Sequence, residues 1–491
     1  MKPLPIWTSK YRKPGVAIHS INGKYYLYKI SSKWDSKLGR SKKITGDYLG
    51  KLTPECLIPP KRNSANADFA KITVKEYGAS MLLDSISTEI RAKLRNIYGE
   101  NGRQIFSIAV QRFLHNSPIK NIGHHFEHSH MSDMYPNSSL SPKYVSDLMQ
   151  KIGSDREKMV LFLRQLGKGS NENLIVDITH ILSSSEKIQW LSIGKDGNGG
   201  FHSMLNMLLI FSNDQMRPIY FRILAGSIRD VSSLKETIEE SQIKDSVFVG
   251  DKGFHSEYNV GMLEKQHLKY VLPIKRNNTA IDYGVMKNAD RKGFDGYFFF
   301  RKKHVWYKEK KLADNRKLIM FFDGRLRLEE ENDFLERLDK MRKNDEEKTE
   351  FTRTFYKKQF EMGTITVVTN TDFTAEKTYQ FLKSRMNIEV AFDTFKNILE
   401  ADRTYMRTNE HLYGWVFVNF ISLLIYYEIY GLLLAKDLLS HFSPKDVALH
   451  FSKVYSVNLD GKKRISEIPK TTRILCQKMG FEENLLLKLP S

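Results

Sequence analysis

The chain has 491 residues, and its 77 lysines and arginines outnumber its 57 aspartates and glutamates, which gives a formal net charge of +20. This length exceeds one compact domain, and an apolar share of 41% excludes a chain that is disordered throughout. The two cysteines, Cys56 and Cys476, are too few for a disulfide framework or a cysteine-based zinc site. The positive charge predicts a polyanionic partner, most commonly nucleic acid. No apolar export signal follows the first charges, so a cytoplasmic protein is expected.

The first 62 residues form a strongly basic segment, with 14 lysines and arginines against three acidic residues. Two alternating stretches, 16–21 and 25–30, flank Asn22-Gly23, which favours a tight β-hairpin because both turn residues tolerate positive φ. Cations interleaved with tyrosines and Trp34 suit phosphate and sugar surfaces. The pattern predicts a basic β-rich DNA-binding unit over 1–62, with a solvated charged face as the alternative.

Residues 63–168 are predicted to form a helical DNA-binding or connecting region. The candidate helices cover 71–83, 86–97, 104–114 and 141–152. Ser141-Pro142 is a good start signal for the last of them, an N-cap followed by proline at the first helical position. The segment 124–130 carries four histidines, but it has neither cysteine nor HExxH spacing. A surface loop is therefore expected there rather than a metal site.

Residues 169–275 change to an α/β pattern. Strands are predicted at 174–176, 204–211 and 219–224, then a helix at 232–240, a strand at 246–249, a helix at 256–266 and a strand at 270–272. This succession predicts a mixed α/β sheet. Asp177 and Asp251 each follow an apolar strand, and open sheets hold their sites at strand ends. A turn or a helix cap is the alternative role for either carboxylate.

The remaining sequence divides into three predicted parts. Residues 276–370 interrupt the α/β pattern with aromatic strands and one charged helix, which indicates a β-rich insertion domain. Residues 371–435 complete the core, and 436–491 form a C-terminal helical tail. The apolar stretch 415–434 has the length of a membrane span but contains Asn419, Ser422 and Glu428. A buried core helix is therefore expected, with no membrane partner.

One predicted helix places Arg385, Glu389 and Lys396 on a common face, because their offsets bring them within about 40° of one another. Such a set is most often a surface salt-bridge network. It also suits a site for metal and phosphodiester, since carboxylates hold Mg²⁺ and cations hold phosphate oxygens. The phosphate-cradling G-x-x-x-x-G-K-[ST] loop is missing from the sequence, so no nucleotide cofactor is expected.

Three motifs of the sequence together resemble a known family. Asp177 in Ile-Val-Asp-Ile-Thr, Asp251 in Val-Gly-Asp-Lys-Gly-Phe, and Arg385-x3-Glu389-x6-Lys396 resemble the DDE transposases of bacterial and archaeal insertion sequences. The similarity is to the group with a YREK signature and a β-rich insertion between the second aspartate and the glutamate. It covers about 170–435 in order, and the N-terminal region also resembles that group.

The resemblance implies a ribonuclease-H-like catalytic core that is split by the insertion. It also implies that Asp177, Asp251 and Glu389 are catalytic and hold two Mg²⁺ ions, with Mn²⁺ as an alternative. The implied reaction cuts transposon ends and joins them to target DNA. The implied partners are double-stranded transposon ends and target DNA, with a homodimer in the synaptic complex, at the nucleoid of the cytoplasm.

The implied DNA-binding residues are Arg385, Lys396, Lys252 and Trp306. Trp306 lies in a basic stretch of the insertion and is a candidate for base stacking, with packing inside its own sheet as the alternative. Leu382 stands where the signature has tyrosine, Met386 where tryptophan is frequent, and Lys252 where arginine is more usual. Two alternatives stay open: a non-mobilising nuclease on the same core, and a retired transposase that only binds DNA.

Overall fold

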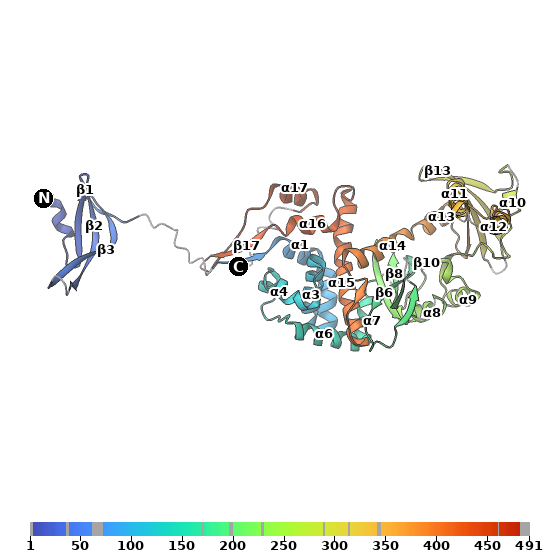
Figure 1. The fold of residues 1–491 in the computed structure, drawn as a ribbon, viewed down its shortest axis with the longest axis horizontal. Helices are drawn as coiled ribbons and strands as arrows, with labels where there is room; N and C mark the ends of the chain where they lie inside the picture. The colour runs from blue at the N-terminus through green and yellow to red at the C-terminus, as the bar shows by residue number, and fades with distance from the viewer. Residues whose placement is uncertain are drawn as a thin grey trace. The chain divides into compact units, whose positions relative to one another are not determined.

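The computed structural model describes residues 3–35, 39–60, 72–167, 171–195, 200–226, 230–287, 290–312, 315–340, 345–459 and 461–481. Two compact units are distinguished: 1–73 with 458–462, and 74–457 with 463–491. The boundary lies about ten residues beyond the end of the predicted basic segment. Each unit is described by itself (Figure 1).

The first unit contains a four-stranded antiparallel sheet in the order β1-β2-β3-β4. Its elements are a 3₁₀ helix Ile6–Tyr11, β1 Val16–Ile21, β2 Lys24–Asp35, β3 Arg40–Leu52 and β4 Leu57–Ile58. Asn22 and Gly23 have φ of 45° and 73°, which confirms the predicted hairpin turn. Trp34 is exposed on β2, beside lysines of β2 and β3 that are also exposed. The sheet therefore presents cations and one large aromatic ring to solvent.

The second unit begins with short elements and helices. They are β5 Thr73–Glu76, α1 Gly78–Ile86, α2 Thr88–Tyr98, α3 Asn101–His115, a 3₁₀ turn Ile119–Asn121, α4 Ile122–Glu127, α5 Met131–Met134, α6 Pro142–Ser154 and α7 Arg156–Arg164. The Ser141 hydroxyl accepts from the Tyr144 N–H, which confirms the predicted start of α6.

Two predictions for this region are wrong. The helix expected over 71–83 starts only at α1, because the Glu76 carboxylate accepts from the Ala79 and Ser80 N–H groups and so caps the helix after β5. The histidine-rich segment begins as α4 rather than as a loop, because Ile122 and Phe126, one turn apart, are both buried.

The predicted strands and helices of the α/β region are all present, and one short strand that was not predicted, β7, is added. The region comprises β6 Asn173–Ser183, a short β7 Ser192–Lys195, β8 Phe201–Ser212, β9 Arg217–Leu224, α8 Asp230–Ser241, β10 Val247–Val249, a 3₁₀ turn Lys252–Phe254, α9 Glu257–Lys265 and β11 Lys269–Pro273. β6, β8 and β9 are antiparallel, whereas β10 is parallel to both β6 and β11. The result is a mixed sheet.

The end of β6 was predicted wrongly. Asp177 lies within the strand rather than at its end, because pairing with β8 continues from Leu174 to Leu182. The polar residues after Asp177 hid this extension, since Thr179 and His180 break the apolar run while the backbone ladder goes on.

Residues 276–370 extend the same sheet. Their elements are α10 Gly284–Lys287, β12 Gly296–Phe300, β13 Lys303–Lys311, β14 Lys317–Asp323, α11 Gly324–Lys340, α12 Asp345–Lys358 and β15 Thr364–Thr369. β15 pairs antiparallel with β11, so the strands run continuously in the order β12-β13-β14-β15-β11-β10-β6-β8-β7. The aromatic strands predicted within 276–370 are confirmed as β12 to β14. The prediction of one charged helix is wrong, because α11 is followed by a second helix, α12.

The prediction that one helix carries Arg385, Glu389 and Lys396 is wrong. The structure has α13 Ala375–Lys383, a break at Ser384 and Arg385, α14 Met386–Asp393, and a π-helix Thr394–Ile398. At the break the Ser384 hydroxyl donates to the Phe381 carbonyl, which satisfies a backbone acceptor that a continuous helix would use. Such breaks and π turns reset the angular position of every later residue.

The C-terminal part contains a two-residue strand β16 Arg403–Thr404, α15 Asn409–Ala435, α16 Pro444–Phe451, β17 Tyr455–Leu459, β18 Lys462–Ile465 and α17 Lys470–Lys478. Among the described residues, α15 is the one helix long and apolar enough to cross a membrane. However, 78% of its most apolar window is buried in the protein, as in a core helix. It packs against α3 and α6 in Figure 1.

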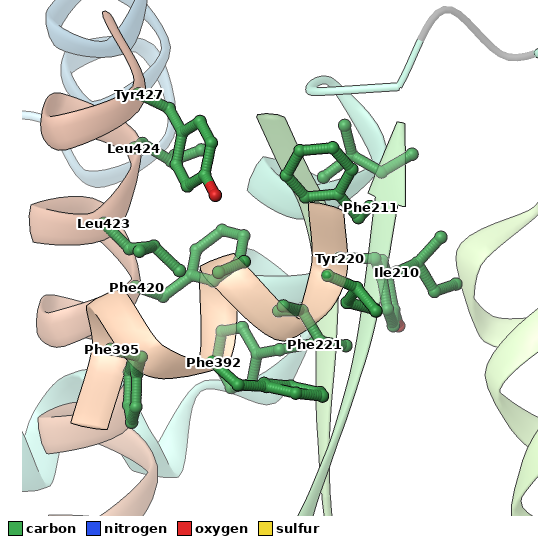
Figure 2. Close-up of a cluster of buried hydrophobic side chains, with 14 of the residues drawn as sticks. Ile210, Phe211, Tyr220, Phe221, Phe392, Phe395, Phe420, Leu423, Leu424 and Tyr427 are labelled. Atoms are coloured by element: carbon green, nitrogen blue, oxygen red, sulfur yellow. The ribbon is translucent and has the colours of Figure 1, made fainter. Parts of the chain in front are cut away.

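The core beside α15 joins the helices to the sheet. Figure 2 shows Phe211 and Phe221 of the strands facing Phe420 and Tyr427 of α15, with Phe392 of α14 and Phe395 of the π-helix next to them. The Phe221 and Phe420 ring centroids lie 5.0 Å apart. These buried rings fix α14 on the face of the sheet.

A buried arginine adds a polar connection to this core. Arg112 of α3 donates to Asn419 Oδ1 of α15 at 3.1 Å and to the Leu399 carbonyl, just after the π-helix, at 2.6 Å. Burial lowers the pKa of Arg112, and Glu400 opposes that shift. The end of the π-helix is therefore held by both the helical region and α15.

Candidate active site

Three carboxylates come from three separate elements. Asp177 lies in β6, Asp251 directly follows Gly250 at the end of β10, and Glu389 is in the first turn of α14. β6 and β10 are parallel, with Val249 opposite Ile175. Asp251 and Asp177 each lie two residues after this pair, so they lie at the same level of the sheet. Strand pairing therefore brings these two carboxylates close together in the sheet.

Arg385 connects the two aspartates. Its Nη2 lies 3.6 Å from Asp177 Oδ2, and its Nη1 donates to Asp251 Oδ1 at 3.2 Å. The side chain is 19% exposed, and the residue stands immediately before α14 because of the helix break. The break thus places a cation between two strand carboxylates.

The electrostatics of Asp177 indicate a crowded acidic site. Burial raises the pKa of Asp177, and the charges of Asp251 and Glu389 raise it further. The Ile178 N–H, which donates to Asp177 Oδ1 at 2.8 Å, and the Arg385 guanidinium act in the opposite direction. The negative charges of Asp251 and Glu389 therefore disfavour ionisation of Asp177. A cation bound nearby would stabilise the ionised carboxylate.

The donor set agrees in kind with a hard divalent cation, because Mg²⁺ takes carboxylate oxygens. In the described part of the chain, no three histidine, cysteine or acidic side chains lie close enough together to hold one ion. Arg385 occupies the position between Asp177 and Asp251. Binding of a divalent ion there requires the guanidinium to shift towards another anion.

A cavity of about 870 Å³ opens beside Asp251, Arg385 and Glu389. Besides Asp251 and Glu389, the acidic residues in its wall are Glu329 and Glu330. The wall contains more cations than carboxylates, and these are Lys252, Lys275, Arg276, Arg301, Lys303, Arg325, Lys383 and Arg385. Such a wall suits a phosphate-rich ligand.

Half of these cations are held by acidic groups. Besides Arg385 between its two aspartates, Arg276 pairs with Glu330, Arg325 with Glu329, and Lys303 with the buried Asp323. The others make no ion pair with any carboxylate in the described ranges, and they are Lys252, Lys275, Arg301 and Lys383. These four cations are therefore the ones most open to a bound anion.

Lys383 stands out among them. Burial lowers its pKa, and the charges of Lys303, Arg301 and Arg385 lower it further, while Asp323 acts in the opposite direction. Its ammonium group lies over the Tyr379 ring, 5.2 Å from the centroid. A phosphate in the cavity would relieve the repulsion among these cations.

Sequence reasoning found Lys252 and Arg385 but missed Lys275, Arg301 and Lys383. Arg301 reaches the cavity from the β12–β13 turn, where it adopts a φ of 45°. Lys383 lies only two residues before Arg385, and this closeness in sequence could have identified it as a site residue. Lys275 and Arg301 could be found only from the pairing of β11, β15 and the hairpin strands.

Two residues predicted to bind DNA lie outside this wall. Lys396 is in the π-helix; burial lowers its pKa, and Asp402 opposes that shift. Trp306 of β13 is partly buried, with its ring centroid 5.1 Å from that of Tyr297 and 6.0 Å from that of Phe294. These contacts agree with the packing alternative, and a stacking role for Trp306 stays a prediction.

Leu382 and Met386, two of the three positions that depart from the family pattern, also line the cavity, as does the third, Lys252. Leu382 is buried at the end of α13, whereas Met386 is about half exposed at the start of α14. Both sit next to the break that presents Arg385.

The histidine-rich segment is separate from this site. The rings of His115 and His125 stack with centroids 4.1 Å apart, and His124 packs on His128 at 4.5 Å. Burial lowers the pKa of His115 to about 4, and the neighbouring His125 and Lys445 lower it too. His115 is therefore neutral where it stacks at the end of α3.

Comparison with known proteins identifies the family to which the chain belongs. Residues 169–425 match the model of the transposase DDE domain family. No curated protein matches the chain. Among solved structures, a cryo-EM structure of a piggyBac transposase synaptic complex with hairpin DNA is similar at 13% identity, over 77% of this chain and 79% of that one, with a TM-score of 0.38. Because the family match spans more than half of the sequence and contains all three carboxylates, the chain belongs to the DDE-domain transposases.

Proposed function

We propose that this transposase cuts the ends of an insertion sequence and joins them to target DNA. The observation that carries the proposal is Arg385, which contacts both Asp177 and Asp251 beside a cavity that Asp251, Glu389 and many cations line. A non-mobilising nuclease would share this arrangement. A retired transposase would be expected to have lost one of the three carboxylates, and all three are present.

The residues divide the chemistry between them. Asp177, Asp251 and Glu389 would hold two Mg²⁺ or Mn²⁺ ions, which supply activation of the attacking oxygen and stabilisation of the leaving oxygen. Arg385, Lys252 and Lys383 would bind the phosphates on either side of the scissile bond. One phosphodiester is exchanged for another, so the reaction needs no nucleotide cofactor.

The assignment of the core is part of the same proposal. The antiparallel β6, β8 and β9 followed by the parallel β10 and β11 support a ribonuclease-H-like core over 169–275 and 371–435. Residues 276–370 would be its β-rich insertion. Residues 436–491 would be its C-terminal tail, which was predicted to be helical but also contains the strands β17 and β18. We place the protein at the nucleoid of the cytoplasm, acting as a homodimer that holds two transposon ends.

The proposal is tested with the full chain and duplexes that carry the DNA flanking its gene. We expect nicked and joined products with Mg²⁺ or Mn²⁺, and none when a chelator removes the ions. Sequencing of joined products would identify transposition by a fixed junction at the element's end. Cutting without any joined product would instead favour the nuclease alternative.

The basic first unit is proposed to contact the end duplex. Deletion of 1–60 is expected to weaken binding and to flatten the dependence of log K on log salt, by about 0.9 for each phosphate that the unit would otherwise bind. Fluorescence anisotropy at a series of salt concentrations measures both effects. An unchanged slope would assign the charge of this unit to solubility.

A further inference from the structure

A second cavity, of about 590 Å³, lies in the helical region between α2 and α3. It shares no residue with the active-site cavity. Three arginines line it, Arg91, Arg95 and Arg103, and the described residues of its wall include neither aspartate nor glutamate. This distinguishes it from the active-site cavity, where acidic and basic groups are mixed. An arginine-lined cavity of this kind selects an anion.

The cavity is built by one stripe of α2. Thr88, Arg91, Ala92, Arg95 and Asn96 follow the i, i+3, i+4, i+7, i+8 pattern, so they share one face of the helix. The opposite wall is α3, which approaches closely at Gly102. A Cβ added there would lie 2.5 Å from the Leu94 carbonyl oxygen. The close approach fixes the spacing between the arginines of the two helices.

Part of the wall is aromatic. Phe106 is fully buried, and the Tyr135 hydroxyl donates to Asp84 Oδ1 at 2.9 Å. Burial raises the pKa of Tyr135 to about 12, so this hydroxyl stays a donor at neutral pH. The Arg103 guanidinium lies over the Tyr135 ring, 6.0 Å from its centroid. This contact helps to orient the Arg103 guanidinium in the wall of the cavity.

The arginines are only partly neutralised. Arg91 pairs with Asp84 at 3.1 Å, and Arg103 pairs with the exposed Glu100 at 3.3 Å. Arg95 makes no ion pair with any acidic residue that the structure describes. An exposed pair such as Arg103–Glu100 is worth little in water, so its guanidinium exchanges partners readily. The guanidinium groups of Arg95 and Arg103 are thus both available to bind one ligand.

We propose that this cavity binds backbone phosphates of the DNA on which the transposase acts, at a point separate from the active site. Arginine forks match phosphate oxygens bidentately. The Asn96 amide offers further donors at the rim. Contacts of this kind fix the position of a duplex without reading its sequence. The inference rests on the proposed function, because it takes DNA as the ligand.

The test uses the full chain with Arg95→Gln and Arg103→Gln, singly and combined, and leaves Arg91 in place because it pairs with Asp84. Lys244→Gln is the matched control, since Lys244 is exposed in the loop after α8. Binding to the end duplex is measured by anisotropy over a range of salt. We expect the double variant to flatten the log K against log salt slope by about 1–2, and Lys244→Gln to leave it unchanged.

Arg95→Lys separates charge from geometry. It keeps the positive charge but removes the fork, so we expect binding between that of wild type and Arg95→Gln. Melting temperatures are measured for each variant. Equal melting temperatures together with a flatter slope support a phosphate contact rather than a folding defect.

The outcomes that overturn the inference are distinct from failure of the proposed function. A wild-type chain that binds no duplex contradicts the proposed function itself. A wild-type chain that binds duplex with the same salt slope as the double variant overturns only the cavity assignment. Inorganic phosphate serves as the second probe. Stabilisation of the wild type by phosphate that both substitutions abolish, with an unchanged duplex slope, would assign the cavity to free phosphate instead of DNA.

Discussion

Asp177→Asn, Asp251→Asn and Glu389→Gln are each expected to lower cleavage of the end duplex by roughly 10²–10³-fold or more, the loss typical of removing one group that stabilises charge in a transition state. Each amide keeps the size of the side chain but removes the negative charge that would hold a divalent ion. Duplex binding should change little, because the phosphate contacts belong to cations. Gel analysis of nicking and anisotropy of binding measure the two effects separately.

Asp393→Asn is the matched control. Asp393 lies one turn after Glu389, is exposed, and accepts from the Asn397 amide at 2.6 Å. It carries the same kind of charge on the same helix but does not line the cavity. Near wild-type cleavage is expected. If Asp393→Asn is inactive and Glu389→Gln is active, the third carboxylate of the site is Asp393.

The sequence was sufficient where a structural feature depends on neighbouring residues. The Asn22-Gly23 turn, the Ser141 cap and the strand before Asp251 are all local, and the structure has them. The family resemblance placed the three carboxylates without knowledge of their neighbours in the fold. What it could not supply was the arrangement of these groups in space.

The features that could not be predicted from the sequence depend on contacts between residues far apart in the chain. The extension of β6 past Asp177 depends on β8, whose residues lie some thirty positions away. The break before α14 falls at Ser384 and Arg385 within an uninterrupted helical pattern, so the sequence gave no sign of it. Arg385 consequently faces Asp177 and Asp251 from the start of a helix, whereas the helical wheel had grouped it with Lys396.

A substitution where α6 and α15 cross is expected to have a large effect on stability. Gly153 and Gly414 are buried where the two helix backbones touch: a Cβ on Gly414 would lie 2.0 Å from the Met149 carbonyl oxygen, and one on Gly153 would lie 1.7 Å from that of Glu410. These contacts are with backbone, so they can be relieved only by moving a helix. Gly414→Ala is expected to lower the free energy of unfolding by about 3 kcal/mol, at the upper end of the usual cost of overpacking.

Gly431→Ala is the control in the same helix, because a Cβ at that position meets no atom within 4 Å. Alanine has a higher helix propensity than glycine by about 1 kcal/mol, so this variant should be as stable as wild type or more stable. Chemical denaturation compares the two variants, and equal stabilisation by both alanines would mean that α6 can move away freely. Opposite signs would show that close helix contact, not propensity, decides the result. α15 also packs on Phe221 of the sheet that contains Asp177. Gly414→Ala is therefore expected to slow cleavage as well, whereas Gly431→Ala should leave it unchanged.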